Sequence, residues 1–195
     1  MIRRVFLDID TQVDFMDPRG KLYVPGAEGL EPNLERLTRY ALERGIPLVS
    51  TLDTHVPDDP EFADFPPHCV RGTAGFGKIA PTTVEGMRLV HFEDNPLVLD
   101  LRLDYPGFMK PGFSAFANPL FGPYVGRFAG YEFIVYGVAT DYCVKASAMG
   151  LVKAGFAVAI VEDAVKPVAR ESGLAALREL ASAGVRFVKT AEVVQ

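Results

Sequence analysis

Short apolar runs alternate along this chain with segments whose apolar residues repeat at helical spacing. The runs that predict strands are residues 3–9, 46–52, 87–92, 131–138, 156–163 and 185–189. A run that is apolar throughout suits a strand covered on both faces, which is the usual condition of a parallel strand. The alternation therefore predicts a single α/β domain over residues 1–195, with a mostly parallel sheet of about six strands and helices on both faces.

The predicted helices have ordinary lengths and recognisable ends. They span residues 28–45, 141–155 and 168–184. In the first, Leu30, Leu34, Leu37 and Ala41 fall on one face, and Gly45 is the residue type that most often ends a helix. We expect that face to pack on the sheet.

Two long stretches, residues 53–83 and 93–124, show neither pattern. The first is rich in Pro, Gly and Asp. Loops of this length within a compact domain usually carry function rather than merely connect elements. We therefore expect the first loop to contribute to a binding site and the second to be an irregular excursion.

Composition narrows the classes of function. The net charge is −5, which argues against a nucleic-acid partner. No apolar run is long enough for a membrane span, and Asp8 and Asp10 interrupt the amino-terminal run too early for a secretory signal. Two cysteines, Cys69 and Cys143, do not make a disulfide framework. We expect a cytoplasmic protein without membrane contacts.

Polar residues follow several of the predicted strands. In an open parallel sheet, ligands bind beyond the carboxyl ends of the strands, where such residues converge. The candidates are Asp10, Gln12, Asp14, Asp53, His55, Lys110 and Cys143. A thiol, a carboxylate and an amine at one edge of a sheet would make a workable nucleophilic site.

Cys143 lies just after a predicted strand and in the first turn of a predicted helix. There the free N–H groups and the helix dipole favour a thiolate, and the same N–H groups can bind an oxyanion. A lone cysteine is also commonly a small buried apolar residue on the inner face of a helix. Position alone leaves both interpretations open.

Asp53 and His55 are separated by one residue, so in extended chain their side chains lie on the same side. His68 follows on the same loop. Carboxylate and imidazole ligands suit a first-row divalent metal ion. The alternative, common for an isolated pair of this kind, is that Asp53 caps a turn and His55 is solvated.

Five phrases of the sequence resemble one enzyme family. "GVATDYCVKASA" closely resembles the nucleophile motif of the nicotinamidase/pyrazinamidase group of isochorismatase-like cysteine hydrolases. "DIDTQVDF" resembles the first-strand motif of that family, and "FMKPGFSAF" its lysine segment. "TLDTHVPDD" and "PPHCVRGTAG" resemble the metal-binding stretch particular to nicotinamidases. The resemblance recurs along most of the chain and implies an isochorismatase-like fold.

The resemblance implies a Cys-Asp-Lys triad of Cys143, Asp10 and Lys110. It also implies an oxyanion hole formed by the N–H groups of Ala139 and Cys143, and a cis peptide bond between Val138 and Ala139. The implied reaction cleaves nicotinamide to nicotinate and ammonia through a cysteine thioester, and pyrazinamide should also be a substrate. Two other acidic residues lie near the triad, and we expect neither Asp8 nor Asp14 to replace Asp10.

The resemblance further implies one divalent metal ion, which would be zinc, manganese or iron. The implied ligands are Asp53, His55, Glu61 and His68. Glu61 departs from the family, which usually has a histidine at that position. Neighbouring carboxylates are alternatives to Glu61, namely Asp58, Asp59 and Asp64.

Phe15 and Phe65 could sandwich a flat ring, since an aromatic ring prefers aromatic walls. Phe65 stands where the family most often has tryptophan, and core packing is the alternative role for both residues. Cys69 and His91 are expected to be structural. The expected partners are a small-molecule amide substrate and further copies of the chain in a homo-oligomer. Two other functions remain open: hydrolysis of another amide or a carbamoyl compound by the same triad, and a catalytically silent binding protein.

Overall fold

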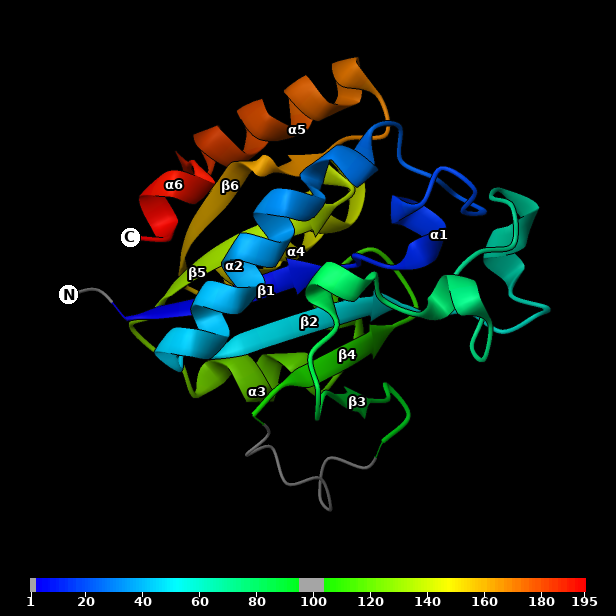
Figure 1. Cartoon of the computed structure of the whole chain (residues 1–195), viewed down its shortest axis with the longest axis horizontal. Helices are drawn as coiled ribbons and strands as arrows, with labels where there is room; N and C mark the ends of the chain where they lie inside the picture. The colour runs from blue at the N-terminus through cyan, green and yellow to red at the C-terminus, as the bar shows by residue number, and fades with distance from the viewer. Residues whose placement is uncertain (1–2, 95–103) are drawn as a thin grey trace.

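One seven-stranded sheet forms the centre of the molecule, with the strand order β3-β4-β2-β1-β5-β6-β7 (Figure 1). The computed structural model describes residues 3–94 and 104–195. The strands are β1 (Arg4–Ile9), β2 (Leu48–Asp53), β3 (Arg88–Val90), β4 (Pro106–Lys110), β5 (Glu132–Val138), β6 (Ala157–Lys166) and β7 (Arg186–Val188). Each neighbouring pair is parallel, as the apolar runs predict.

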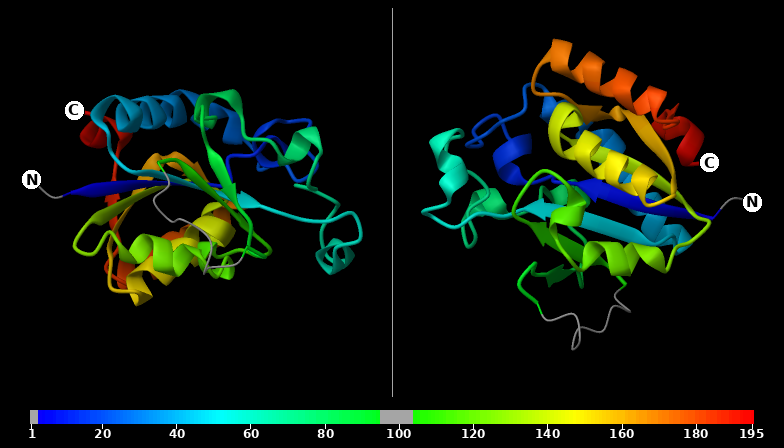
Figure 2. Two further views of the ribbon diagram at one scale, coloured as in Figure 1. Left: turned by 90° about the horizontal axis from the view of Figure 1, so that it is seen from below. Right: turned by 180° about the vertical axis from the view of Figure 1, so that it is seen from behind.

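Helices cover both faces of this sheet, which confirms the predicted α/β architecture. On one face lie α1 (Val13–Met16), α2 (Glu31–Arg44) and α6 (Thr190–Val193). On the other lie α3 (Phe121–Gly126), α4 (Lys145–Lys153) and α5 (Arg170–Ser182). Figure 1 shows α2 crossing in front of the sheet, and the view from behind in Figure 2 shows α3 and α4 crossing the opposite face. The apolar core is therefore divided into two layers by the sheet.

Helix α2 behaves as its sequence predicts. Leu34, Leu37 and Ala41 are fully buried, and Leu30 is buried in the 3₁₀ turn (Ala27–Leu30) that precedes the helix. Gly45 ends the helix with a φ of 61°, and its N–H bonds to the last carbonyls of the helix. A left-handed residue at this position satisfies carbonyls that would otherwise lack partners.

Strand β4 is the element that the apolar runs do not reveal. It lies within the stretch 93–124, which was expected to be irregular, and all five of its residues are buried between β2 and β3. Its sequence begins with Pro106 and Gly107, and both residue types are disfavoured in strands. Proline is tolerated here because it is the first residue of the strand. Residues 95–103 of the same stretch lie outside the described residues.

The loop 53–83 is pinned to the sheet at several points. Its short 3₁₀ turns are η2 (Pro60–Ala63), η3 (Ala74–Phe76) and η4 (Ala80–Thr82). Lys78 forms a buried ion pair of 2.6 Å with Asp8 of β1. Asp14 accepts the N–H of Cys69 at 2.8 Å and that of Lys21 at 3.0 Å. Asp8 and Asp14 therefore hold the loop against β1 and α1.

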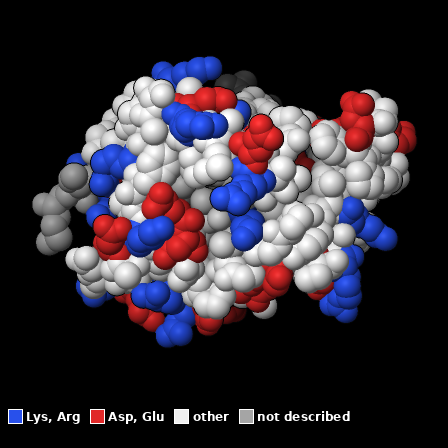
Figure 3. Space-filling model, turned by 90° about the horizontal axis from the view of Figure 1, so that it is seen from above, with Lys and Arg blue, Asp and Glu red and all other residues white. Residues whose placement is uncertain are grey.

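The surface carries both signs of charge. On the face drawn in Figure 3, Lys and Arg side chains are interspersed with Asp and Glu. Neither sign forms a continuous stripe on that face. Among the described residues, no helix combines the length and the apolar character that crossing a bilayer requires.

The approach of β5 to β1 is so close that residue 137 must be glycine. Gly137 has a φ of 111°, and a Cβ placed there would lie 2.0 Å from the carbonyl oxygen of Ile9. We predict that Gly137→Ala lowers the free energy of unfolding by about 3 kcal/mol or more, because backbone strain and overpacking add. Urea-induced unfolding measures this loss.

Gly155→Ala is the matched control for this prediction. Gly155 has a similar φ of 86°, but a Cβ there meets no atom within 4 Å. Its substitution should cost about 1 kcal/mol, from backbone conformation alone. Equal losses in the two variants would contradict the importance of the contact with Ile9.

Candidate active site

Four adjacent strands end at the same edge of the sheet and bring the candidate residues together. Asp10 follows β1, Asp53 ends β2, and Lys110 ends β4. Cys143 lies in the short π-helical turn Thr140–Val144, which follows β5 and leads into α4. Since these four strands are consecutive in the order β4-β2-β1-β5, residues far apart in sequence meet at one point.

Lys110 is the centre of this group and is fully buried. Its Nζ lies 2.8 Å from Asp10 Oδ2 and 3.1 Å from Asp53 Oδ1. The same nitrogen donates to the carbonyl of Gly112 at 2.9 Å and to Cys143 Sγ at 3.4 Å. The three residues of the expected triad are therefore in contact, and Asp53 joins them as a second carboxylate.

The charges of this group keep Lys110 protonated. Burial alone would lower the pKa of Lys110, but Asp10 and Asp53 outweigh that effect and hold the pKa well above its usual value. Burial raises the pKa of Asp10, and Lys110 only partly opposes the rise. A carboxylate with a raised pKa is better matched to proton transfer near neutral pH than an ordinary one.

The backbone and one hydroxyl fix the orientation of Asp10. Its φ of 47° lies in the left-handed region, so the chain turns sharply as it leaves β1. Thr51 of β2 donates its hydroxyl to Asp10 Oδ1 at 2.6 Å. This bond favours the ionised carboxylate and lowers the pKa of Asp10 against the effect of burial.

Cys143 differs from the thiolate expected at a helix start. Burial raises the pKa of the Cys143 thiol well above its usual value; Lys110 lowers it, and Asp10 and Asp53 raise it further. The physical reason is that one ammonium faces two carboxylates, so a third negative charge is unfavourable in a buried site. The raised pKa favours the thiol form of Cys143 over the thiolate. Asp10 hydrogen-bonds to that thiol.

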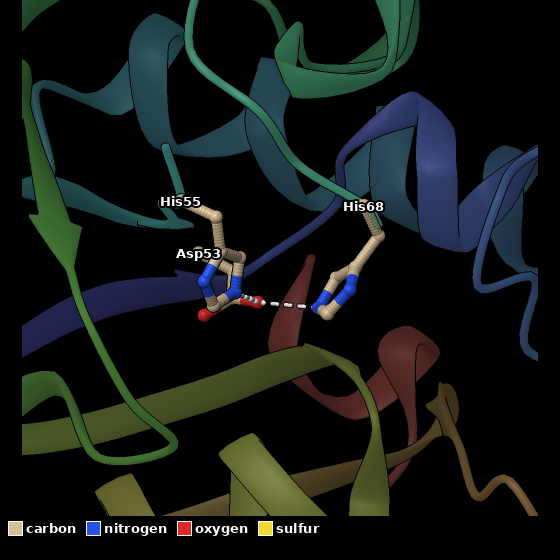
Figure 4. Close-up of side chains that lie close together, drawn as sticks. All are labelled: Asp53, His55 and His68. Atoms are coloured by element: carbon tan, nitrogen blue, oxygen red, sulfur yellow. Dashed lines mark hydrogen bonds and ion pairs between the residues drawn. The ribbon is translucent and has the colours of Figure 1, made fainter. Parts of the chain in front are cut away.

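Asp53 also belongs to a second cluster, which it forms with His55 and His68 (Figure 4). Both imidazole Nε2 atoms face Asp53 Oδ2, at 3.1 Å for His55 and 3.2 Å for His68. One ligand atom from each of the three residues lies within 4.8 Å of the others, and all three residues are buried. Asp53 therefore faces Lys110 with one carboxylate oxygen and the two histidines with the other.

The outer nitrogens of both rings are already engaged. His68 Nδ1 donates to the carbonyl of Pro66 at 2.8 Å, and His55 Nδ1 lies 3.0 Å from Asp59 Oδ2. Contacts of this kind orient metal-binding histidines and leave Nε2 for the metal. The donor set of one carboxylate and two imidazoles fits a divalent first-row ion. Asp53 and Asp59 also overcome the effect of burial on His55 and raise its pKa to about 9.

Glu61 lies beside this cluster rather than at its centre. It has an oxygen within 4.8 Å of ligand atoms of His55 and Asp59, in a group that does not include Asp53 or His68. It nevertheless lines the same cavity as those two residues. Asp53, Glu61 and His68 thus line the cavity, whereas His55 is buried behind it and belongs to both clustered groups.

An open, largely apolar cavity lies above Cys143. Aromatic side chains contribute much of its wall: Phe15, Phe65, Phe113 and Tyr142. Leu22, Val24 and Val168 add aliphatic surface, and Ala139, Cys143, Asp53, Glu61 and His68 line its polar side. The Val138–Ala139 peptide bond beside the cavity is cis. Phe15 and Phe65, the two residues expected to hold a flat ring, both line the cavity.

Sequence reasoning did not identify Phe113 and Tyr142 as part of the cavity. Their rings pack edge to face with a centroid separation of 5.3 Å, and each lies 6.5 Å from the ring of Phe65. Phe113 follows Lys110 by three residues and Tyr142 immediately precedes Cys143. Proximity to the candidate catalytic residues was the available signal, but periodicity does not predict the direction of a loop side chain.

Asp141, two residues before Cys143, fixes the backbone of the cavity wall at Val168. Its carboxylate accepts the N–H of Val168 at 3.0 Å, that of Ala169 at 3.3 Å, and the hydroxyl of Ser172. Asp141 therefore caps the amino terminus of α5 from a separate element, since Ala169 at the cap position has no capping side chain. Val168, which borders the cavity, is thereby fixed to the turn that carries Cys143.

The chain is similar to known proteins over most of its length. Nicotinamidase/pyrazinamidase of Mycobacterium tuberculosis is 28% identical over 192 residues, covering 95% of this chain and 98% of that protein. Pyrazinamidase of Pyrococcus horikoshii, solved in complex with zinc, has a TM-score of 0.78 at 29% identity and covers 96% of this chain and 99% of that one. A protein of L. infantum solved in complex with nicotinate has a TM-score of 0.77 at 27% identity, covering 97% and 94%.

The isochorismatase domain family matches residues 4–192. That range includes all seven strands and every candidate residue described above. The chain belongs to the isochorismatase family.

Proposed function

We propose that this protein is an amidohydrolase that cleaves nicotinamide to nicotinate and ammonia, and that it also accepts pyrazinamide. The observation that carries the proposal is the contact of Lys110 with both Asp10 and Cys143 beneath an aromatic-lined cavity. A nucleophile, a proton acceptor and a fixed positive charge are the groups that amide hydrolysis through a thioester requires. Relatives named as nicotinamidases and pyrazinamidases support the choice of substrate.

In the first half of the reaction, Asp10 accepts the thiol proton and Cys143 Sγ attacks the amide carbon. The C=O π-electrons move to oxygen and a tetrahedral intermediate forms. Asp10 then gives its proton to the amide nitrogen, the C–N bond breaks, and ammonia leaves. The product of this half is an acyl thioester on Cys143 and an ionised Asp10.

In the second half, Asp10 takes a proton from water and the resulting hydroxide attacks the thioester carbon. The C–S bond breaks and the sulfur recovers its proton from Asp10. The carboxylic acid loses its own proton to solvent and leaves as the carboxylate. Lys110 remains charged throughout, because Asp10 and Asp53 keep its pKa high. Its positive charge offsets the negative charge that passes between Asp10, Cys143 and the substrate.

Backbone N–H groups of Ala139 and Cys143 are proposed to bind the oxyanion. Both residues line the cavity, on the side where the nucleophile lies. Phe15 and Phe65 are proposed to hold the pyridine or pyrazine ring between them. Since the wall is mainly apolar, a neutral aromatic amide fits the cavity better than a charged one.

The proposed metal ligands are Asp53, His55, His68 and, as the fourth, Glu61. The first three already present their donor atoms to a common point. When bound, a zinc, manganese or iron ion would act as a Lewis acid that binds the ring nitrogen of the substrate and orients the ring. Asp59 and the carbonyl of Pro66 would hold the imidazoles of His55 and His68 in place.

We predict that the purified protein releases ammonia from nicotinamide and pyrazinamide, and that Cys143→Ala abolishes this release while remaining folded. The reason is that no other described thiol contacts Asp10 or Lys110. Ammonia release is measured across nicotinamide, pyrazinamide, an aliphatic amide and an N-carbamoyl amino acid. Circular dichroism checks the fold of the variant.

Cys69→Ala is the control, because Cys69 is buried and does not line the cavity. It should retain most of the activity. More than a few per cent of activity in Cys143→Ala would refute the nucleophile assignment. If only the carbamoyl compound is hydrolysed, the proposed substrate is wrong, but the proposed triad stands.

A second prediction concerns pH. Asp10 must be ionised to accept the thiol proton, so kcat/KM should fall as the pH falls through the raised pKa of Asp10. Thr51→Val removes a hydrogen bond that stabilises the ionised form, and therefore raises the pKa of Asp10 further. The acid limb of the kcat/KM profile should move to higher pH.

Thr38→Val is the matched control for the pH profile, since Thr38 is a buried threonine beside Tyr136 and away from Asp10. Its acid limb should coincide with that of the unmodified protein. An unchanged or acid-shifted limb in Thr51→Val would show that Asp10 is not the group that controls it.

A third prediction concerns the choice of metal. Glu61 offers an anionic oxygen ligand, whereas histidine offers a neutral nitrogen that zinc prefers over manganese. We predict that Glu61→His raises zinc affinity relative to manganese by about tenfold, the scale on which neighbouring groups alter metal sites. Competitive metal titration followed by elemental analysis measures the ratio.

Asp64→His serves as the control for this substitution, since Asp64 is a nearby carboxylate outside the clustered groups. It should leave the ratio unchanged. If Glu61→His also leaves the ratio unchanged, Glu61 is not a ligand, and water or Asp59 takes that position.

A further inference from the structure

Gln12 is a fully buried side chain that makes three hydrogen bonds to the backbone of other segments. Its Oε1 accepts the N–H of Asp53 at 2.7 Å, and its Nε2 donates to the carbonyl of Asp53 at 2.9 Å. The same nitrogen donates to the carbonyl of Phe76, also at 2.9 Å. The side-chain amide thus pairs with Asp53 on both sides, as a neighbouring strand would.

Asp53 is the residue on which the two halves of the site meet. One of its oxygens faces Lys110 at 3.1 Å, and the other faces His55 and His68. A displacement of its backbone therefore moves a partner of the triad and a candidate metal ligand together. The side chain that holds this backbone on one side is Gln12.

The position of Gln12 also ties Asp53 to the catalytic turn after β1. The N–H of Gln12 bonds to the carbonyl of Asp10 at 2.7 Å, so the two residues belong to one tight turn. Its backbone forms an antiparallel bridge with Lys78, near the end of the loop 53–83. Gln12 therefore connects three segments: the turn that carries Asp10, the end of β2, and the last part of the loop 53–83.

We propose that Gln12 is a positioning residue that couples the Cys-Asp-Lys triad to the metal-binding cluster by fixing the backbone of Asp53. This inference rests on the proposed function of the same site. The role requires a donor and an acceptor on one planar group of this length. A carboxylate has no donor, and asparagine is one methylene shorter.

Gln12→Glu is the most informative variant, because it preserves the size and planarity of the side chain. One oxygen can still accept the N–H of Asp53. The other replaces Nε2 and faces the carbonyls of Asp53 and Phe76, where two acceptors repel each other. At pH 8, where the introduced carboxylate is ionised, the backbone of Asp53 should therefore shift although the side-chain volume at position 12 is unchanged.

Asn118→Asp is a matched control. Asn118 is also fully buried; its amide donates to the carbonyls of Val90 and Met109 at 3.0 Å and 2.8 Å, and it accepts the N–H of Leu120 at 2.9 Å. The control therefore makes the same change to the same three kinds of bond, without contact with Asp53. It reports the general loss of stability that such a change causes.

The experiment titrates each metal-free protein with zinc chloride by calorimetry, and then measures kcat at saturating zinc. For Gln12→Glu we expect zinc affinity to fall by about 10–100-fold, the range observed for groups that support metal ligands. We also expect kcat to remain at least about tenfold low when zinc is saturating, since the contact of Asp53 with Lys110 is disturbed too. For Asn118→Asp, both values per folded molecule should stay near those of the unmodified protein.

Three results would overturn the proposal. One is unchanged zinc affinity and kcat in Gln12→Glu, which would make Gln12 purely structural. Another is weakened zinc binding with full recovery of kcat at saturating zinc, which would remove the coupling to the triad. The third is equal effects in both variants. If the unmodified protein does not hydrolyse nicotinamide, the proposed substrate fails, and the zinc titration still decides whether Gln12 supports the metal-binding cluster.

A variant that does not fold is replaced by Gln12→Met, which has similar length but neither donor nor acceptor. Thermal unfolding of both Gln12 variants and of Asn118→Asp gives the fraction folded at the assay temperature. All constants are then compared per folded molecule. Loss of zinc binding in folded Gln12→Met supports the proposal, and retained binding overturns it.

Discussion

A buried ammonium group is the constraint on which this site depends. Lys110 has no solvent exposure, so its charge is tolerable only while Asp10 and Asp53 remain beside it. Removing one partner from such a buried group costs about 3–5 kcal/mol. The requirement extends to topology, because Asp10 follows β1, Asp53 ends β2 and Lys110 ends β4. The charge on Lys110 is therefore stabilised only because the strand order brings both carboxylates beside it.

Burial and the same charges bear on how Cys143 would be activated in the proposed reaction. Both raise the pKa of its thiol, so the proposed mechanism removes the proton as the sulfur attacks. Asp10, which is held between Thr51 and Lys110, is the proposed acceptor of that proton. An apolar cavity above the charges suits this scheme, since a neutral substrate enters without adding a further charge.

Much of this arrangement is predictable from the sequence, because the carboxyl ends of parallel strands are the usual place for such residues. Asp10, Asp53 and Cys143 each follow a clear apolar run. Lys110 is a candidate without a predicted strand before it, and only the family resemblance gives it a catalytic role. Strand β4 begins with Pro106 and Gly107, so its neighbours rather than its own propensity make it a strand.

Other features depend on contacts that no local pattern encodes. Phe113 and Tyr142 enter the cavity through the course of their loops, and the distance of Glu61 from Asp53 depends on how the 3₁₀ turn η2 is placed. The raised pKa of Cys143 likewise follows first from its burial and then from the charges around it, which only the assembled site reveals.

The capping of α5 by Asp141 has a consequence for how this enzyme can evolve. Val168 forms part of the cavity wall yet is 44% exposed, so its side chain can change in size without disturbing either core layer. Its backbone, by contrast, is held by Asp141 to the turn that bears Cys143. If the proposed function holds, substitutions at this position can alter which amides are accepted without moving Cys143. Descendants of such a chain would then differ in substrate specificity before they differed in mechanism.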